Sequence, residues 1–259
     1  MKNRLLIPII LILLLISCQR TVQQDQSFTL EEYQKRGIPE LDLSWEIEDY
    51  ELVYEQLSKI KFQQAMSLPR KDSKKSGMLF DRLISGENLA FVDNDSIPLA
   101  DKVFRIRYFG DFMDDLIYIY TDIFSREQYY NVELTYLYAA KLAVGEKMMD
   151  LAKRILSSES EDDRSYVSGL EAIRYIYLNK LHFVMEKQQF RSLYSKKEYR
   201  MLCDSVAAAL NRNMEWFDAE MASKMAQQLQ LVTDSVDIPA VHRQYQEILN
   251  NLGELIPDV

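Results

Sequence analysis

The chain has 259 residues, of which 40 are acidic and 31 basic, so its formal net charge at pH 7 is -9. An acidic surface is a poor partner for nucleic acid, where affinity comes from neutralising phosphates, and for an anionic membrane surface. We therefore expect no nucleic-acid partner. Glycine and proline are scarce, with 7 and 6 residues, which predicts few turns and long helices.

The N-terminus has the pattern of an export signal. Lys2 and Arg4 precede an apolar run at 5–16, which ends at Ser17 and Cys18. This run is too short for a bilayer core, which needs about 20 helical residues. A basic start, a short apolar run and small residues predict a signal peptide over 1–17. The alternative is an uncleaved signal anchor with an incidental cysteine.

The residues Leu15, Ile16, Ser17 and Cys18 resemble the lipobox of bacterial lipoproteins. In that family a lipid is attached to the cysteine sulfur, a peptidase cuts just before the cysteine, and the new amino group is usually acylated. The resemblance covers residues 1–18 alone. It implies cleavage between Ser17 and Cys18 and a membrane anchor at Cys18, and two or more chains give the stable anchoring that one chain does not.

In the same family, the residues after the cysteine influence whether the protein is sorted to the inner or the outer membrane. Asp at the next position favours inner-membrane retention in many Gram-negative lipoproteins, whereas this chain has Gln19. The segment also lacks the acidic run that some groups use for surface display. The resemblance therefore implies a cell-envelope protein on the outer membrane that faces the periplasm. The polar segment 18–28 is interpreted as a lipidated, flexible tether.

Capping residues and apolar spacing predict helices along the rest of the chain. Thr29 with Glu32 predicts a short helix, Ser44 a helix from Trp45 to about 67, and 77–91 another short helix after a basic loop at 68–75. Pro98 suits the first position of a longer helix. Asp237, Ile238 and Pro239 predict a last helix to about 252.

The long helices are predicted at 98–124, 125–156 and 160–190, and from Ser195 onward. Ser195 with Glu198 forms a capping box, and apolar residues then recur at helical spacing from Tyr199 to Leu229 without glycine or proline. No segment shows strand-like alternation of useful length. The sequence therefore predicts an all-α, up-and-down bundle of about four long helices, with shorter N- and C-terminal helices. Residues 29–259 form one helical domain, or an N-terminal subdomain at 29–92 packed on a bundle at 98–252.

Two histidines are the first candidates for chemistry, because imidazole is a common metal ligand. His182 and Glu186 are four residues apart and share a helix face. No third ligand is identifiable, and the Glu-x-x-His pairs of di-iron bundles are absent. We keep this pair as a weak ligand or metal candidate beside the alternative of an ordinary surface pair, and predict no metal centre.

Tyrosines gather where the predicted helices at 98–124 and 125–156 meet. Tyr118, Tyr129, Tyr130, Tyr136 and Tyr138 exceed what one apolar face needs, and tyrosine suits both half-buried packing and binding grooves. They are a possible binding surface, with core packing as the alternative. Cys203 lies between Leu202 and Val206 in an apolar pattern, which predicts a buried, inert thiol.

The motifs of common enzyme classes are missing from the sequence: a phosphate-cradling glycine loop, Cys-x-x-Cys, His-Glu-x-x-His and a glycine-flanked serine. We therefore predict no catalytic residue and no cofactor. The preferred hypothesis is a non-enzymatic, lipid-anchored helical module that binds or scaffolds an envelope protein. The alternatives are a helical carrier or sensor of a small molecule or cation, and an envelope hydrolase without a sequence-local motif.

Overall fold

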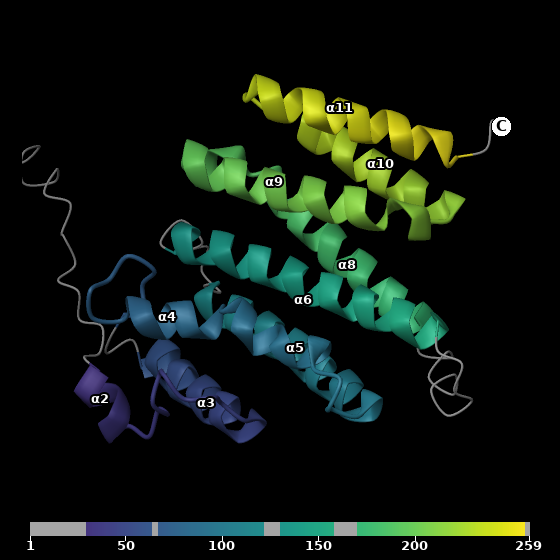
Figure 1. The fold of residues 1–259 in the computed structure, drawn as a ribbon. Helices are drawn as coiled ribbons and strands as arrows, with labels where there is room; N and C mark the ends of the chain where they lie inside the picture. Colours follow the sequence, from purple (N-terminus) through teal and green to yellow (C-terminus); the bar gives the residue numbers. More distant parts are fainter. Residues whose placement is uncertain (1–29, 64–66, 122–129, 158–169, 257–259) are drawn as a thin grey trace, which may run out of the picture.

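The computed structural model describes residues 30–63, 67–121, 130–157 and 170–256 (Figure 1). Within these ranges the chain forms helices and no strand, which confirms the predicted all-α fold. The signal peptide, Cys18, the tether, Thr29, Ser125, Tyr129 and Ser160 lie outside the described residues. The helices are α2 (Leu30–Lys35), α3 (Ile47–Gln63), α4 (Gly77–Leu83), α5 (Leu99–Tyr120), α6 (Asn131–Ser157), α8 (Leu170–Gln188), α9 (Lys196–Asn213), α10 (Ala219–Thr233) and α11 (Pro239–Glu254).

The long helices stack in two layers, and the chain reverses direction from each to the next (Figure 1). In one layer α6 contacts α9, and α9 contacts α11; in the other, α8 contacts α10. At the lower end of the stack α5 packs on α6, and α3 packs on α5. The antiparallel neighbours follow from the short connections between long helices. None of the described helices combines the length and the apolar character needed to cross a bilayer.

One continuous apolar core runs through the stack, from Ile38 to Leu252. Its largest fully buried side chains include five tyrosines: Tyr120, Tyr138, Tyr177, Tyr199 and Tyr245. A buried hydroxyl needs a hydrogen-bond partner, and backbone carbonyls supply two of them. Tyr120 donates to the carbonyl of Pro69 at 2.7 Å, and Tyr177 donates to that of Ala209 at 2.9 Å. The tyrosine-rich composition therefore serves packing between elements distant in sequence.

Two predicted helix starts are confirmed in detail. Ser195 and Glu198 form the capping box that opens α9, with the Ser195 hydroxyl and the Glu198 carboxylate each accepting from the other's backbone N–H. Pro239 occupies the first turn of α11. Both signals are local, because they satisfy backbone groups within one helical turn. By contrast, α3 begins at Ile47 rather than at Trp45, and the Asp49 carboxylate accepts from the N–H of Glu46.

The prediction of one uninterrupted helix from Ser195 to Leu229 is wrong. The chain turns through a short 3₁₀ segment at Met214–Trp216, which separates α9 from α10. Asn213 is fully buried there, and its amide donates to Tyr177 Oη at 2.9 Å. Asp218 then caps α10 by accepting from the N–H of Met221 at 2.9 Å. Apolar spacing continues across the break because both helices bury a face in the same core.

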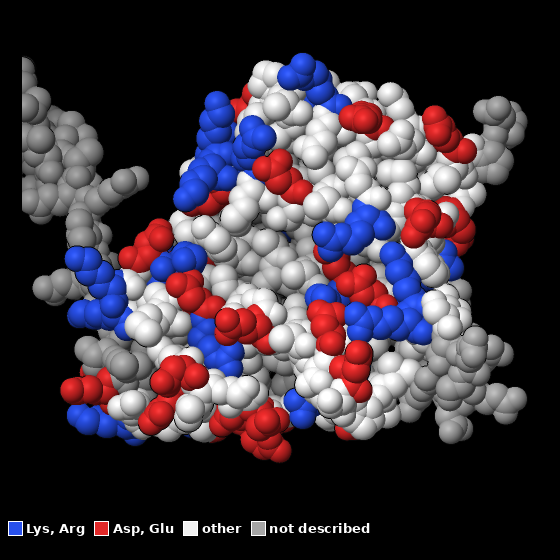
Figure 2. Space-filling model, in the orientation of Figure 1, with Lys and Arg blue, Asp and Glu red and all other residues white. Residues whose placement is uncertain are grey.

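Charged side chains occur in small mixed groups on the face shown in Figure 2, rather than in one acidic field. One such group joins the 3₁₀ segment η1 (Gly86–Asp93) to α6. Asp93 accepts from Lys147 at 2.7 Å and from Arg154 at 2.6 Å, and Arg154 also donates to the carbonyl of Val92. These contacts hold η1 on α6 and thereby fix one wall of the site described next.

Candidate functional site

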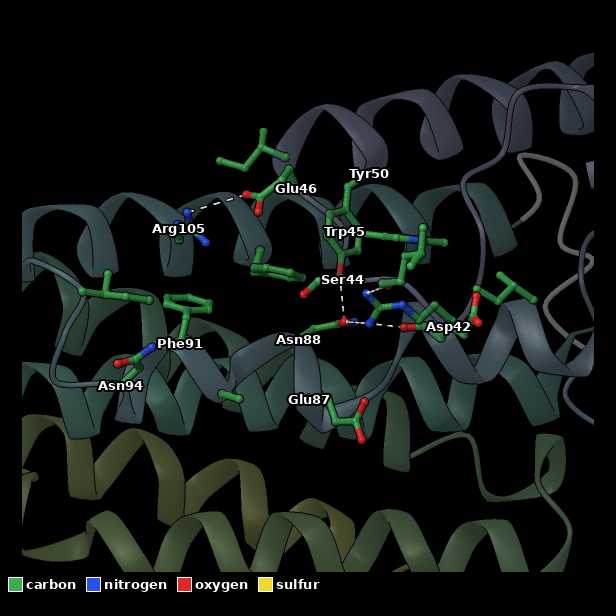
Figure 3. A pocket seen from close by; sticks show the side chains of 17 residues that line it. Asp42, Ser44, Trp45, Glu46, Tyr50, Glu87, Asn88, Phe91, Asn94 and Arg105 are labelled. Atoms are coloured by element: carbon green, nitrogen blue, oxygen red, sulfur yellow. Dashed lines mark hydrogen bonds and ion pairs between the residues drawn. The ribbon is translucent and has the colours of Figure 1, made fainter. Parts of the chain in front are cut away.

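A pocket of about 640 Å³ opens at the N-terminal end of the stack. We call it the N-terminal pocket (Figure 3). Its walls come from the segment 41–47 before α3, from the end of α4, from η1 and from the first half of α5. Pockets of this size, with an aromatic wall and a few polar groups, are the usual form of small-ligand sites. Four separate segments must therefore fold together before the pocket exists.

The most unusual group in the N-terminal pocket is the guanidinium of Arg82. It lies over the ring of Trp45, 4.9 Å from the centroid. It donates to the carbonyl of Leu43 at 3.0 Å and to Asn88 Oδ1, and its Nε is buried without an acceptor. Both acceptors are neutral, and no described carboxylate forms an ion pair with Arg82. The pocket therefore contains a fixed guanidinium without a direct ion pair, although the carboxylates of Asp42, Glu46 and Glu87 also line the pocket.

Asn88 holds this arrangement in place. Its Oδ1 accepts from the Tyr50 hydroxyl at 2.7 Å, and its Nδ2 donates to the carbonyls of Arg82 and Leu83 at 3.0 and 3.3 Å. Burial raises the pKa of Tyr50 to about 12, against the opposing influence of the Arg82 charge. Tyr50 is therefore a neutral hydrogen-bond donor at physiological pH.

The opposite wall combines an apolar surface with a charged rim. The Phe91 ring stacks on Phe109, with 6.1 Å between the centroids. At the rim Arg105 and Glu46 form an exposed ion pair at 3.6 Å (Figure 3). No histidine or cysteine is among the described residues that line the pocket. Its groups can therefore bind and orient a ligand through charge and hydrogen bonds.

Two of the predicted tyrosines, Tyr130 and Tyr136, contact the basic loop at 68–75. The Tyr130 ring lies under the Arg70 guanidinium at 4.2 Å, and its hydroxyl accepts from the N–H of Leu68 at 3.3 Å. Lys71 lies 5.3 Å from the Tyr136 ring. Buried Glu133 on α6 accepts from the backbone N–H of Lys71 at 2.8 Å. The loop is thus attached to the first turns of α6.

The other tyrosines are separated from these. Tyr118 is exposed on α5, where Lys61 Nζ lies 4.1 Å from its ring centroid. Tyr138 is buried and meets the edge of Phe183 at a centroid distance of 5.7 Å. The four described tyrosines of the predicted set therefore lie in three different environments. Tyr129 lies outside the described residues.

His182 and Glu186 both lie exposed on α8. Within the part of the chain that the structure describes, no three His, Cys, Asp or Glu side chains come close enough to hold a metal ion. The structure therefore brings no further ligand of these types to this pair. Cys203 is a fully buried free cysteine, as predicted.

Sequence reasoning missed Arg82 and Asn88 as site residues. Arg82 and Asn88 both lie in the stretch 77–91, which the sequence predicts only as a short helix. Their roles depend on Trp45 and Tyr50, which come from a segment about 40 residues earlier. No spacing rule connects these positions.

No protein-family model, curated protein or solved structure matches this chain. The functional assignment therefore depends on the geometry and charge of the chain's own residues.

Proposed function

We propose that this protein is a lipid-anchored binding module of the cell envelope, which captures an acidic segment of an envelope protein in the N-terminal pocket. The observation that carries the proposal is the guanidinium of Arg82, which is fixed by Trp45, Leu43 and Asn88 but has no carboxylate partner among the described residues. An Asp or Glu side chain of the partner would supply that charge.

Binding geometry favours a carboxylate at this position. Arginine offers paired N–H groups that match the two oxygens of a carboxylate, and a preformed fork loses little freedom on binding. Arg82 is already immobilised by three contacts, so its donors are oriented before a ligand arrives. The Phe91 and Phe109 rings on the opposite wall offer an apolar surface for another residue of the partner.

The position of the pocket in the chain suits a membrane-bound partner. With the lipid at Cys18, the chain to Leu30 reaches at most about 40 Å even when fully extended. The segment 41–47, which lines the pocket, follows α2 within a few residues. The anchor would therefore hold the pocket near the membrane surface and raise its effective concentration toward membrane-associated proteins.

The test is site-specific photo-crosslinking in the native host, with the crosslinking residue at Leu43 or, as a matched control, at Leu231. The two leucines are 56% and 57% exposed, but Leu43 lines the pocket and Leu231 lies on α10. We expect Leu43 to capture one partner through a peptide that contains Asp or Glu. The Arg82→Gln and Cys18→Ala variants should each lose this capture.

The control variant Arg200→Gln changes an exposed arginine on α9, away from the pocket, and should leave capture unchanged. Circular dichroism of Arg82→Gln establishes that the variant is folded. If it is unfolded, the test instead uses a version of the captured peptide in which Asn and Gln replace every Asp and Glu, and this peptide should fail to bind the wild-type protein. Capture that is equal from Leu43 and Leu231, or absent from Leu43, contradicts the proposal.

A further inference from the structure

A second cavity, of about 430 Å³, lies away from the N-terminal pocket, between α5 and α8 over the surface of α6. We call it the lysine cleft, because Lys141 of α6 and Lys180 of α8 line it. Its other walls are Arg107, Gly110, Asp111 and Asp114 of α5, Met148 of α6, and Ile176, Asn179 and Phe183 of α8.

Both lysines are buried, with only 8% of Lys141 and 5% of Lys180 exposed. They share one carboxylate. Lys141 donates to Asp114 Oδ1, and Lys180 Nζ lies 3.6 Å from Asp114 Oδ2. Asp114 is itself 47% exposed, so much of its charge is already screened by solvent. A buried charge is costly unless it is well paired, and here two buried cations depend on one half-exposed anion.

Two helix positions next to the lysine cleft, Gly110 and Gly145, have no side chain. A Cβ atom at Gly110 of α5 would lie 3.3 Å from Lys180 Nζ. One at Gly145 of α6 would lie 3.0 Å from the Tyr177 ring and 3.6 Å from Lys180 Cδ. Glycine weakens a helix interior, so its use at these two positions carries a cost in stability. Gly110 leaves room for the Lys180 ammonium group, and Gly145 leaves room for the Tyr177 ring.

The charges that line the cleft do not balance. Three cations, Arg107, Lys141 and Lys180, face two carboxylates, Asp111 and Asp114. The side chain of Arg107 is exposed and has no hydrogen bond or ion pair with any described residue. Burial is the main influence on the pKa of Lys180 and lowers it, Asp114 opposes that shift, and the neighbouring charge of Lys141 adds to it. One further negative charge would neutralise the cleft of an otherwise acidic protein.

We propose that the lysine cleft binds a small monocarboxylate, whose charged group lies between Lys141, Lys180 and Arg107 and whose apolar part contacts Met148, Ile176 and Phe183. The Phe183 ring lies 4.4 Å from Lys141 Nζ, so the apolar wall directly adjoins the cationic group. This site is separate from the N-terminal pocket, and neither proposal depends on the other.

The local charges select this ligand class over others. A cation would meet two ammonium groups that are already short of negative charge. A dianion such as a phosphate ester would exceed the single uncompensated charge and would lie beside both aspartates. A ligand that is charged at one end and apolar at the other matches the arrangement of donors and apolar side chains.

The test is isothermal titration calorimetry of the full mature protein with two probes, benzoate and 3-methylbutanoate, and with benzamide as the uncharged counterpart of benzoate. We expect at least one carboxylate to bind at millimolar or lower concentration, and benzamide not to bind. Lys180→Met should weaken binding about tenfold or more, because it removes a buried charged donor. Lys59→Met, at an exposed lysine paired with Glu55, should leave binding unchanged.

Two glycine-to-alanine substitutions give a second comparison, in which the charge of the protein does not change. Gly110→Ala places a methyl group against the Lys180 ammonium and should weaken binding, whereas Gly253→Ala on α11 meets nothing within 4 Å and should not. Circular dichroism checks that each variant is folded. Binding of neither carboxylate at millimolar concentration, equal binding of benzamide, or full binding by Lys180→Met overturns the proposal.

Discussion

The hydroxyl of Tyr50 donates a 2.7 Å hydrogen bond to Asn88 Oδ1, although 38 residues separate the two in the chain. Through this contact the first turn of α3 determines where η1 lies. The same amide oxygen accepts from Arg82, so one side chain positions both the aromatic donor and the guanidinium of the N-terminal pocket. A single buried amide thus connects the stability of this end of the protein to the shape of its candidate site.

Asn88→Ala should therefore be strongly destabilising. It leaves the buried Tyr50 hydroxyl without its acceptor and removes one of the acceptors of Arg82, with an expected loss of about 3 kcal/mol in the free energy of unfolding. Urea denaturation followed by circular dichroism measures this loss. The control is Asn94→Ala, which changes the exposed residue that directly follows η1. It should lower the free energy of unfolding by less than about 1 kcal/mol. Equal losses in the two variants would contradict the role of Asn88 in holding Tyr50 and Arg82.

Acid should weaken the contact between η1 and α6. Hydrogen bonds from Lys147 and then Arg154 lower the pKa of Asp93 below its ordinary value of 3.8. The unfolded chain therefore takes up the proton first, and the stabilisation present above pH 3.8 is lost as pH falls through the lower folded-state pKa. Urea midpoints measured from about pH 5 to pH 2.5 should fall less steeply for Asp93→Asn than for the wild type. Asp95→Asn should follow the wild type; a parallel fall in all three proteins contradicts the role of Asp93.

Cys203 should be inert in the folded protein. Burial raises the pKa of its thiol to about 11, and hydrogen bonds from Tyr245, Tyr199 and Gln188 lower it only in part. At about pH 8 almost no thiolate is present, and the sulfur is inaccessible. Ellman's reagent should give no reaction from Cys203 in buffer and a full reaction in denaturant. Native reaction at the rate of an exposed thiol would show that α9 opens far more readily than its packing indicates.

Lys180→Met should raise stability while it weakens ligand binding. The folded state lowers the pKa of Lys180 through burial, so the charged form at neutral pH opposes folding. An apolar side chain of similar volume removes that opposition and leaves Asp114 paired with Lys141, for an expected gain of about 1 kcal/mol. Urea denaturation tests this, with Lys59→Met expected to change stability by less than about 0.5 kcal/mol. A large loss would assign Lys180 a structural role instead.

The lipid anchor is tested by intact-mass analysis of protein from its native host. The mature chain should begin at Cys18 and should carry the added mass of its acyl chains. Cys18→Ala should retain residues 1–17, because the peptidase of the lipoprotein family acts on the modified cysteine. A wild-type chain that still starts at Met1, or one with a bare thiol at residue 18, rules out the lipoprotein reading.

The sequence by itself determined the features that depend on neighbouring residues. The capping box at Ser195 and Glu198, the helix start at Pro239 and the absence of strand patterns were all readable, because helix caps and apolar periodicity act within one or two turns. The same periodicity hid the break at Met214–Trp216, since it reports which face is buried and not whether the backbone continues.

The tertiary structure alone decided where charge is left unbalanced. Arg82 meets Trp45 and Asn88, and Lys141 meets Lys180, only after helices from distant parts of the chain pack together. Burial changes what such residues can do, because the free energy of a charge depends on the solvent and partners around it in three dimensions. The sequence does not distinguish a lysine on a solvated face from one in a cleft, because only the packing of distant helices buries the second.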